Sequence, residues 1–196
     1  MGFQRLVLGT AVTALVAVGA LVAVGRGPVA LPNMPMKGRI DARHEILLVE
    51  EPRCTGCRLF YETVYPRLSA EYVATGRAKI RLLLVSFLDG SRPMANAALA
   101  VARDAPDRFF EYLGGLYRMR GEVTAEQLVE LARTVGQIPL PALEACLKSE
   151  CMGAQLDYNI RAAESLMGAD YGTPAVYLNG KRVEPLTYSQ LTGRME

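Results

Sequence analysis

Two cysteines separated by two residues, Cys54-Thr-Gly-Cys57, are the side chains of this sequence best suited to chemistry. They lie between a segment predicted to be a strand and one predicted to be a helix, which puts Cys54 at the helix N-terminus. Unpaired backbone N–H groups and the helix dipole favour negative charge there, so we expect the pKa of the Cys54 thiol to lie below its free value of about 8.5. The second sulfur is close enough to close a small ring or to resolve a mixed disulfide. The spacing therefore favours redox chemistry at this pair.

The other two cysteines, Cys146 and Cys151, leave further interpretations open. They could complete a zinc site with Cys54 and Cys57, although the two pairs are far apart in the sequence. The first pair could also be a purely structural disulfide, although so tight a loop contributes little stability. Cys146 and Cys151 lie at a junction between predicted helices, where a break near Ser149 would bring them into bonding range. We expect them to form a second, structural disulfide; a regulatory or electron-relay pair and two free thiols are the alternatives. We expect no metal site.

The segments on either side of the first pair predict a parallel pair of strands. Residues 45–50 are short, apolar and β-prone, which is typical of a buried strand. A helical pattern follows Cys57 to about Ala74, where Gly76 ends it. Residues 79–87 are a second candidate for a buried strand. A strand, a helix and a strand in this order indicate a right-handed crossover between parallel neighbours.

The region from about 93 to 168 contains no convincing strand. Thr124-Ala-Glu-Gln127 resembles an N-terminal capping box within it. Helix breakers divide the region into amphipathic helices at 93–103, 106–120, 124–135, 140–149 and 152–167. The aromatic residues expected in the core of this block are Phe109, Phe110, Tyr112 and Tyr117.

The C-terminal part of the chain predicts a hairpin. Residues 173–178 and 181–183 read as strands, and Asn179-Gly180 between them is typical of a type I′ turn. A short helix at about 188–194 follows the second strand.

The N-terminal segment and the composition indicate export. Residues 6–25 hold 15 apolar residues in 20 and no charge, which is long enough to cross a bilayer as a helix. We expect residues 1–26 to be a membrane anchor or a cleaved signal peptide, followed by a proline-containing linker at 27–39. The remaining length suits one domain, and a net charge of +2 without a basic run argues against nucleic-acid binding. Disulfides persist in an exported chain.

The order of motifs resembles the thioredoxin superfamily. The resemblance rests on strand–Cys54-Thr-Gly-Cys57–helix, followed by Gly172-Thr173-Pro174-Ala-Val, a hairpin and a terminal helix. The helical block between these motifs makes the chain similar to the DsbA-like branch, the exported thiol–disulfide oxidoreductases. The resemblance covers residues 40–196. It implies an α/β, thioredoxin-like fold with an inserted helical domain at about 92–168. The N-terminal apolar helix, expected from the run at 6–25, precedes this fold.

The resemblance also implies a role for each motif residue. Cys54 would be the exposed nucleophile and Cys57 the buried resolving cysteine. Pro174 would be a cis-proline facing the pair, preceded by Thr173, and its bent peptide exposes backbone groups that bind an extended substrate. No cofactor is implied. The implied partners are protein or peptide thiols and disulfides, and a redox partner that resets the cysteine pair. The apolar run at 6–25 adds a membrane as an expected partner. The implied location is periplasmic or extracytoplasmic, at the inner membrane.

Three positions depart from the family pattern. Gly56 stands where strongly oxidising members carry a histidine, and Leu48 stands where many relatives place a buried acid. Proton transfer at Cys57 must then use water or another group, such as Glu50 or Glu51. Thr173 before the proline is seen among isomerase and reductase relatives. We favour the oxidase direction, with a reductase or isomerase of the same fold, or a non-catalytic membrane-anchored peptide-binding module, as alternatives.

Overall fold

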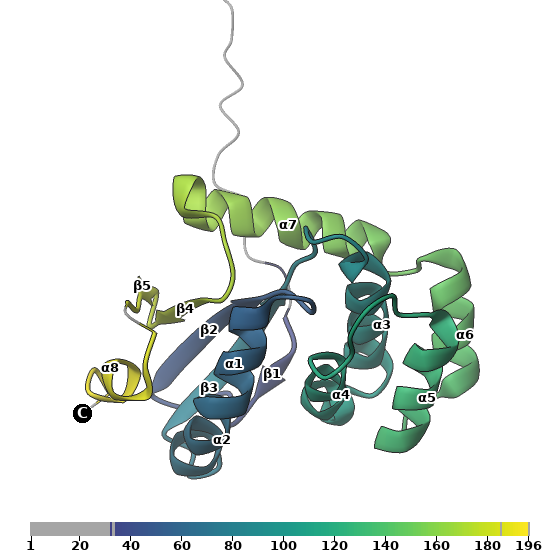
Figure 1. The fold of residues 1–196 in the computed structure, drawn as a ribbon. Helices are drawn as coiled ribbons and strands as arrows, with labels where there is room; N and C mark the ends of the chain where they lie inside the picture. The colour runs from purple at the N-terminus through teal and green to yellow at the C-terminus, as the bar shows by residue number, and fades with distance from the viewer. Residues whose placement is uncertain (1–31, 33, 185, 196) are drawn as a thin grey trace, which may run out of the picture.

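The computed structural model describes residues 32, 34–184 and 186–195, which form a mixed sheet with helices on both faces (Figure 1). The strands are β1 (Met36–Lys37), β2 (His44–Glu50), β3 (Ala78–Leu84), β4 (Ala175–Leu178) and β5 (Lys181–Arg182). The α-helices are α1 (Thr55–Thr63), α2 (Tyr65–Leu68), α3 (Ser91–Asp104), α4 (Phe109–Leu116), α5 (Ala125–Val135), α6 (Leu140–Ser149), α7 (Gly153–Met167) and α8 (Tyr188–Thr192). A π-helical turn and two 3-10 turns lie at Ser69–Val73, Pro106–Arg108 and Gly168–Asp170.

The expected anchor or signal helix, residues 1–26, lies outside the described residues. Part of the expected linker, 27–39, lies outside them too. In the part of the chain that the structure describes, no helix combines the length and the apolar character needed to cross a membrane.

The sheet has the order β1-β3-β2-β4-β5, and its centre is the predicted parallel pair. β2 runs parallel to β3, with Leu48 opposite Leu82, while β4 is antiparallel to β2. The edge strand β1 falls within the segment expected to be a linker, where it pairs with β3. The reason is the backbone: β3 has an otherwise open edge, and its Leu82 N–H donates to the carbonyl of Pro35 at 3.0 Å. A proline lacks only the donor, so it can still supply this acceptor.

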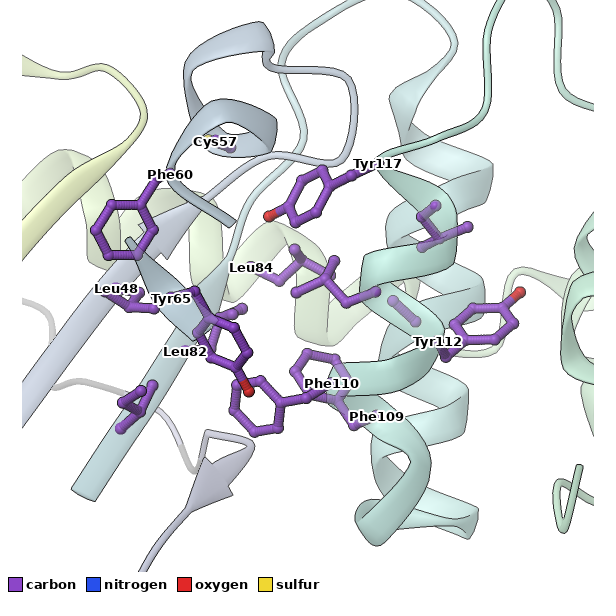
Figure 2. Close-up of a cluster of buried hydrophobic side chains, with 14 of the residues drawn as sticks. Leu48, Cys57, Phe60, Tyr65, Leu82, Leu84, Phe109, Phe110, Tyr112 and Tyr117 are labelled. Atoms are coloured by element: carbon purple, nitrogen blue, oxygen red, sulfur yellow. The ribbon is translucent and has the colours of Figure 1, made fainter. Parts of the chain in front are cut away.

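Both faces of β2 are buried, because alternate side chains point to opposite sides of the sheet. Ile46 and Leu48 belong to the core that α1, α3 and α4 cover (Figure 2). Leu47 and Val49 belong to a smaller core on the other face, against α7. Glu50 shares the parity of Ile46 and Leu48, so β2 ends with a carboxyl group on the face that α1 covers.

The helix that follows Cys57 is interrupted, although the sequence pattern predicts one helix to about Ala74. α1 ends at Thr63, α2 begins at Tyr65, and a π-helical turn completes the segment. Pro66 lies in the first turn of α2 and has no N–H with which to continue α1.

The helical block α3–α7 lies between β3 and β4 in the sequence, as expected. The main difference from the predicted helices concerns the one at 106–120. The helix predicted at 106–120 is a 3-10 turn followed by α4, which ends at Leu116. The predicted capping box of α5 is confirmed: Thr124 and Gln127 exchange side-chain and backbone hydrogen bonds at 2.9 and 3.3 Å.

The β4–β5 hairpin is also confirmed. Asn179 and Gly180 have φ angles of 49° and 79°, as a type I′ turn requires at both central residues.

Candidate active site

The turn after β2 places the two nearby cysteines at the start of α1. Cys54 is the N-cap of α1 and is half-buried, whereas Cys57 lies in the first turn and is fully buried. The Cys57 backbone N–H donates to Cys54 Sγ at 3.3 Å. Both side chains are free thiols in this structure. The helix therefore presents one accessible sulfur at its N-terminus and a second, buried sulfur behind it.

The two sulfurs have opposite acid–base properties. The side-chain hydrogen bond from Cys57 lowers the pKa of Cys54 to about 5, against the opposing effect of partial burial. Burial raises the pKa of Cys57, and the hydrogen bond to Cys54 raises it further. At neutral pH the pair therefore holds a Cys54 thiolate and a Cys57 thiol.

The residues Thr173 and Pro174 lie against this pair. The antiparallel register puts Ala175 opposite Val49, so the two residues before β4 extend past the end of β2 toward Cys54. The Thr173–Pro174 peptide bond is cis. Cys54 Sγ lies 3.3 Å from the Thr173 carbonyl oxygen, to which the thiol form donates. The element order thus brings together the four residues that the sequence analysis singled out for exchange chemistry.

The contact between Gly56 and Pro174 explains why the residue before Cys57 is small. A Cβ atom at this position would lie 2.8 Å from Pro174 Cδ and 3.7 Å from Cys54 Sγ. A larger side chain would have to displace the proline ring, so glycine permits the close approach of Pro174 to the cysteine pair.

A buried carboxyl group stands behind Cys57. Tyr117, at the end of α4, extends toward α1 (Figure 2), and its hydroxyl donates to Glu50 Oε2. Glu50 is 1% exposed, and its Oε1 has no hydrogen-bond partner among the described residues. Burial raises the pKa of Glu50 to about 8, and the Tyr117 hydrogen bond opposes that rise. The charge of the ionised Glu50 carboxylate raises the pKa of Cys57, so the two groups are close enough to interact electrostatically.

Glu51 has a different position. Its Oε2 accepts the backbone N–H of Arg53 at 2.7 Å, and its carbonyl accepts the N–H of Cys54 at 3.1 Å. Burial raises the pKa of this carboxyl as well. Of the two acids that the sequence left open, Glu50 acts on the pKa of Cys57, while Glu51 braces the turn that leads to Cys54.

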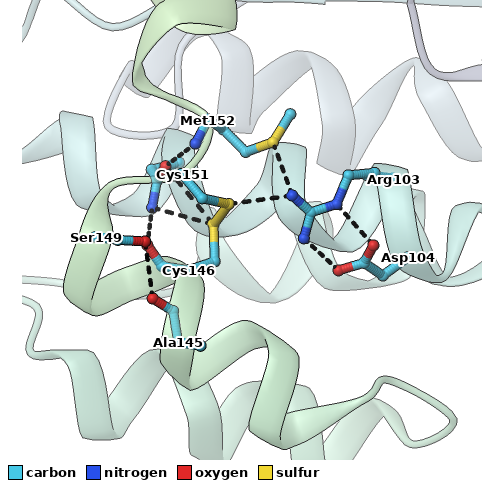
Figure 3. The surroundings of a disulfide bond; sticks show 8 residues. Arg103, Asp104, Ala145, Cys146, Ser149, Cys151 and Met152 are labelled. Atoms are coloured by element: carbon cyan, nitrogen blue, oxygen red, sulfur yellow. Dashed lines mark hydrogen bonds and ion pairs between the residues drawn. A yellow bond between two sulfur atoms is a disulfide. The ribbon is translucent and has the colours of Figure 1, made fainter.

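The second pair of cysteines forms a disulfide at the junction of α6 and α7 (Figure 3). Glu150, which follows α6, has a left-handed conformation with φ 50°, and the resulting break leaves the two Cα atoms 4.7 Å apart. Asn96 of α3 accepts the N–H of Met152 at 2.9 Å and so ties the junction to the core. Because Cys146 and Cys151 are bonded to each other, they do not complete a zinc site with the first pair.

The geometry is that of a thioredoxin-type exchange site, and comparison with known proteins agrees. Residues 31–196 match the family model described as Thioredoxin. The chain belongs to the thioredoxin family. Among curated proteins it is similar to disulfide bond formation protein D of Bacillus subtilis strain 168, with 23% identity over 81% of this chain and 73% of the relative. The probable disulfide bond formation protein D of Bacillus anthracis is 24% identical over 76% of this chain and 70% of its own.

Solved structures of the DsbA-like branch share the fold. DsbA of Chlamydia trachomatis superposes with a TM-score of 0.79 and 27% identity, covering 86% of this chain and 92% of its own. BdbD from Bacillus subtilis, in its oxidised form, gives a TM-score of 0.76 and 22% identity, covering 83% and 90%. The resemblance seen in the sequence is confirmed: this chain is a DsbA-like thiol–disulfide oxidoreductase of the thioredoxin family.

Proposed function

We propose that this protein oxidises pairs of thiols in exported polypeptides, with Cys54 as the reacting sulfur and Cys57 as the resolving sulfur. The observation that carries the proposal is the contrast between the two sulfurs: a half-buried Cys54 with a pKa of about 5, and a buried Cys57 whose pKa is raised. A stabilised Cys54 thiolate stabilises the reduced protein, and a disulfide whose reduced form is stabilised is a strong oxidant.

The exchange proceeds in two steps that balance. A substrate thiolate, having lost its proton to water, attacks Sγ of Cys54 in the Cys54–Cys57 disulfide, and Cys57 leaves and takes up a proton. A second substrate thiol loses its proton to water and attacks the substrate sulfur of the mixed disulfide, and Cys54 leaves as a thiolate. Two electrons pass from the substrate to the protein, the substrate gains a disulfide, and the cysteine pair is reduced.

The backbone near Cys54 supports binding of an extended substrate chain. The carbonyl oxygen of Thr173 lies 3.3 Å from Cys54 Sγ, and the cis bond to Pro174 turns that peptide group toward the sulfur. Main-chain hydrogen bonds of this kind recognise a polypeptide without regard to its sequence.

Glu50 supplies the proton that the leaving Cys57 sulfur needs. A pKa of about 8 keeps this carboxyl mostly protonated at neutral pH, and its Oε1 has no hydrogen-bond partner among the described residues. Glu50 then recovers its proton from water, so the net proton count of the exchange is unchanged.

Three further assignments accompany the proposal. We assign residues 1–26 to a membrane anchor or signal, 27–39 to a linker and 40–196 to the catalytic domain, with the helical insertion at about 92–168. The apolar run at 6–25 and the Cys146–Cys151 disulfide support an oxidising, extracytoplasmic location. A membrane or soluble redox partner must reoxidise Cys54 and Cys57 after each turnover.

A reductase or isomerase is the second candidate, because Thr173 precedes the cis-proline and Gly56 replaces a histidine. The equilibrium of the cysteine pair with glutathione decides between them. We expect a reduction potential closer to the value of about −120 mV for DsbA than to the value of about −270 mV for thioredoxin. A potential at or below the thioredoxin value would contradict the oxidase direction.

Cys54→Ala should abolish exchange, and retained activity would contradict the role of Cys54.

A further inference from the structure

A small, positively charged pocket opens beside Cys54. Its volume is about 110 Å³, and Cys54 lines it together with Arg53, Arg58 and Arg120. Among the described residues, no carboxylate side chain lines it. Pockets that enclose whole small molecules measure roughly 300–1,000 Å³, so this pocket suits a single side-chain group.

Backbone carbonyls hold two of the three guanidinium groups in place. Arg53 Nη1 donates to the carbonyl of Gly121 at 2.7 Å, and Arg120 Nη1 donates to the carbonyls of Tyr117 and Met119, both at 2.7 Å. A guanidinium has five N–H donors. Within the described part of the chain, Nε and Nη2 of Arg53 and Arg120 have no hydrogen-bond partner, so they remain available to a ligand.

The third arginine is compensated only weakly. Arg58 Nη1 lies 4.0 Å from Glu62 Oε1, and its side chain is 33% exposed. The pocket therefore combines fixed donors with uncompensated positive charge, which is the arrangement that proteins use to bind carboxylates.

The redox state of Cys54 changes the charge of this pocket. In the reduced protein the Cys54 thiolate adds a negative charge to the lining of this pocket. In the oxidised protein that negative charge is absent, so the pocket is most positive in the form that accepts a substrate. An anionic group is therefore expected to bind the oxidised protein more tightly than the reduced protein.

We propose that this pocket binds a carboxylate side chain next to the reacting cysteine of a polypeptide substrate. Cysteines flanked by aspartate or glutamate are then the preferred substrates of the exchange. This inference rests on the proposed function, because it concerns the substrate of the same site.

Peptides that differ at one position test the proposal. Two synthetic peptides each carry two cysteines and differ only in having Asp or Asn beside the reacting cysteine. The oxidised protein is mixed with each peptide, and the products of quenched reactions are separated by chromatography. We expect the Asp peptide to react about two- to tenfold faster, the range that one or two partly exposed charged contacts give. The ratio should approach one in about 1 M salt, where the screening length is roughly 3 Å.

Variants of the arginines separate substrate recognition from effects on the sulfur. Arg58→Gln with Arg120→Gln should bring the Asp/Asn ratio close to one. Any change in the pKa of Cys54 affects both peptides equally and cancels in the ratio. Arg118→Gln is the matched control, because Arg118 is an exposed arginine of the same loop that does not line the pocket.

The outcomes distinguish this inference from the proposed function. Equal rates for the two peptides, or an unchanged ratio in the double variant, would overturn the pocket assignment while leaving the oxidase function intact. Failure of the protein to oxidise either peptide would overturn the function itself. An effect of the arginine variants on the reaction with reduced glutathione, without one on the peptides, would identify a small anionic thiol as the ligand and overturn the polypeptide assignment.

Discussion

Glu50 brings a carboxyl group to the face of β2 that Ile46 and Leu48 share. An isolated charge is costly to bury, and a buried acid avoids the cost by keeping its proton. The raised pKa of Glu50, about 8, is this effect. A neutral acid beside Cys57 can give a proton to the sulfur at the moment when that sulfur leaves the disulfide, so the burial of Glu50 serves the chemistry.

Replacement of this acid should slow the exchange. Glu50→Gln keeps the size of the side chain and an oxygen for the Tyr117 hydroxyl, but it removes the proton that Cys57 needs. We expect the rate constant for peptide oxidation to fall by about 10²-fold, the lower end of general acid–base catalysis. The variant is measured by quenched reaction beside Glu144→Gln, an exposed glutamate of α6 that serves as the matched control. Equal rates for wild type and Glu50→Gln would show that water protonates Cys57.

Tyr117 should set the pH range in which Glu50 works. Its hydroxyl bond lowers the pKa of Glu50, so Tyr117→Phe leaves that pKa further above the wild-type value of about 8. The oxidation rate requires protonated Glu50 and falls as the pH rises through its pKa. We therefore expect the alkaline limb of the pH–rate profile to move to higher pH in Tyr117→Phe. A profile that loses amplitude at all pH values without moving would assign Tyr117 a purely structural role.

The sequence predicted the groups that exchange sulfur better than the groups around them. A two-residue spacing, a Thr-Pro before a hairpin and the element order suffice to bring Cys54, Cys57 and the cis-proline together. To choose between Glu50 and Glu51 as the acid near Cys57, one must know which face of β2 is covered by α1. The sequence of one strand does not reveal this. Leu48 lacks the expected acid, but side chains alternate along a strand, so residue 50 lies on the same face one step further along.

Among the elements, the regular strands and the helix caps were predictable, while the interruptions were not. The capping box of α5 and the type I′ hairpin are set by local residue types. Pro66 accounts for the break between α1 and α2, although the apolar period continues through it, and the early end of α4 depends on how the helices pack. In α4, a Cβ atom on Gly114 would lie 2.3 Å from the Tyr61 hydroxyl oxygen, so this glycine is required by a neighbouring helix. Helical periodicity alone carries no such information.

The junction of α6 and α7 depends on its disulfide (Figure 3). A cross-link that closes so short a loop is expected to contribute about 2 kcal/mol by restricting the unfolded chain. Cys146→Ala with Cys151→Ala should lower the free energy of unfolding by that amount and leave the peptide oxidation rate unchanged. Urea unfolding followed by circular dichroism measures the first quantity. A double variant with normal stability but a changed reduction potential would instead make this pair part of the redox chemistry.

At the scale of the whole molecule, Cys54 and Glu50 link stability to pH in opposite directions. In the reduced protein the pKa of Cys54 is about 5, against an ordinary value of 9.0, so the folded state holds fewer protons than the unfolded state between these values. Stability contributed by Cys54 therefore rises with pH across that range. The pKa of Glu50 is about 8, against an ordinary value of 4.5, so the folded state holds more protons and stability falls as the pH rises. The two effects oppose each other only in the reduced protein, where Cys54 is not part of a disulfide.

The oxidised protein should therefore lose stability with rising pH more steeply than the reduced protein. In the oxidised form Cys54 does not titrate. The loss of stability that Glu50 causes between pH 4.5 and about 8 is then not opposed by Cys54. In reduced Glu50→Gln the Glu50 effect is removed, and stability should rise with pH above about 5 more steeply than in the reduced wild type. The chain has no tryptophan, so urea unfolding at a series of pH values is best followed by circular dichroism. Reduced Cys54→Ser, which lacks the thiolate, should behave like the oxidised protein. The same pH dependence of stability in all these forms would mean that neither Cys54 nor Glu50 has a different pKa in the folded and unfolded states. The pKa shifts on which the proposed exchange chemistry depends would then be absent.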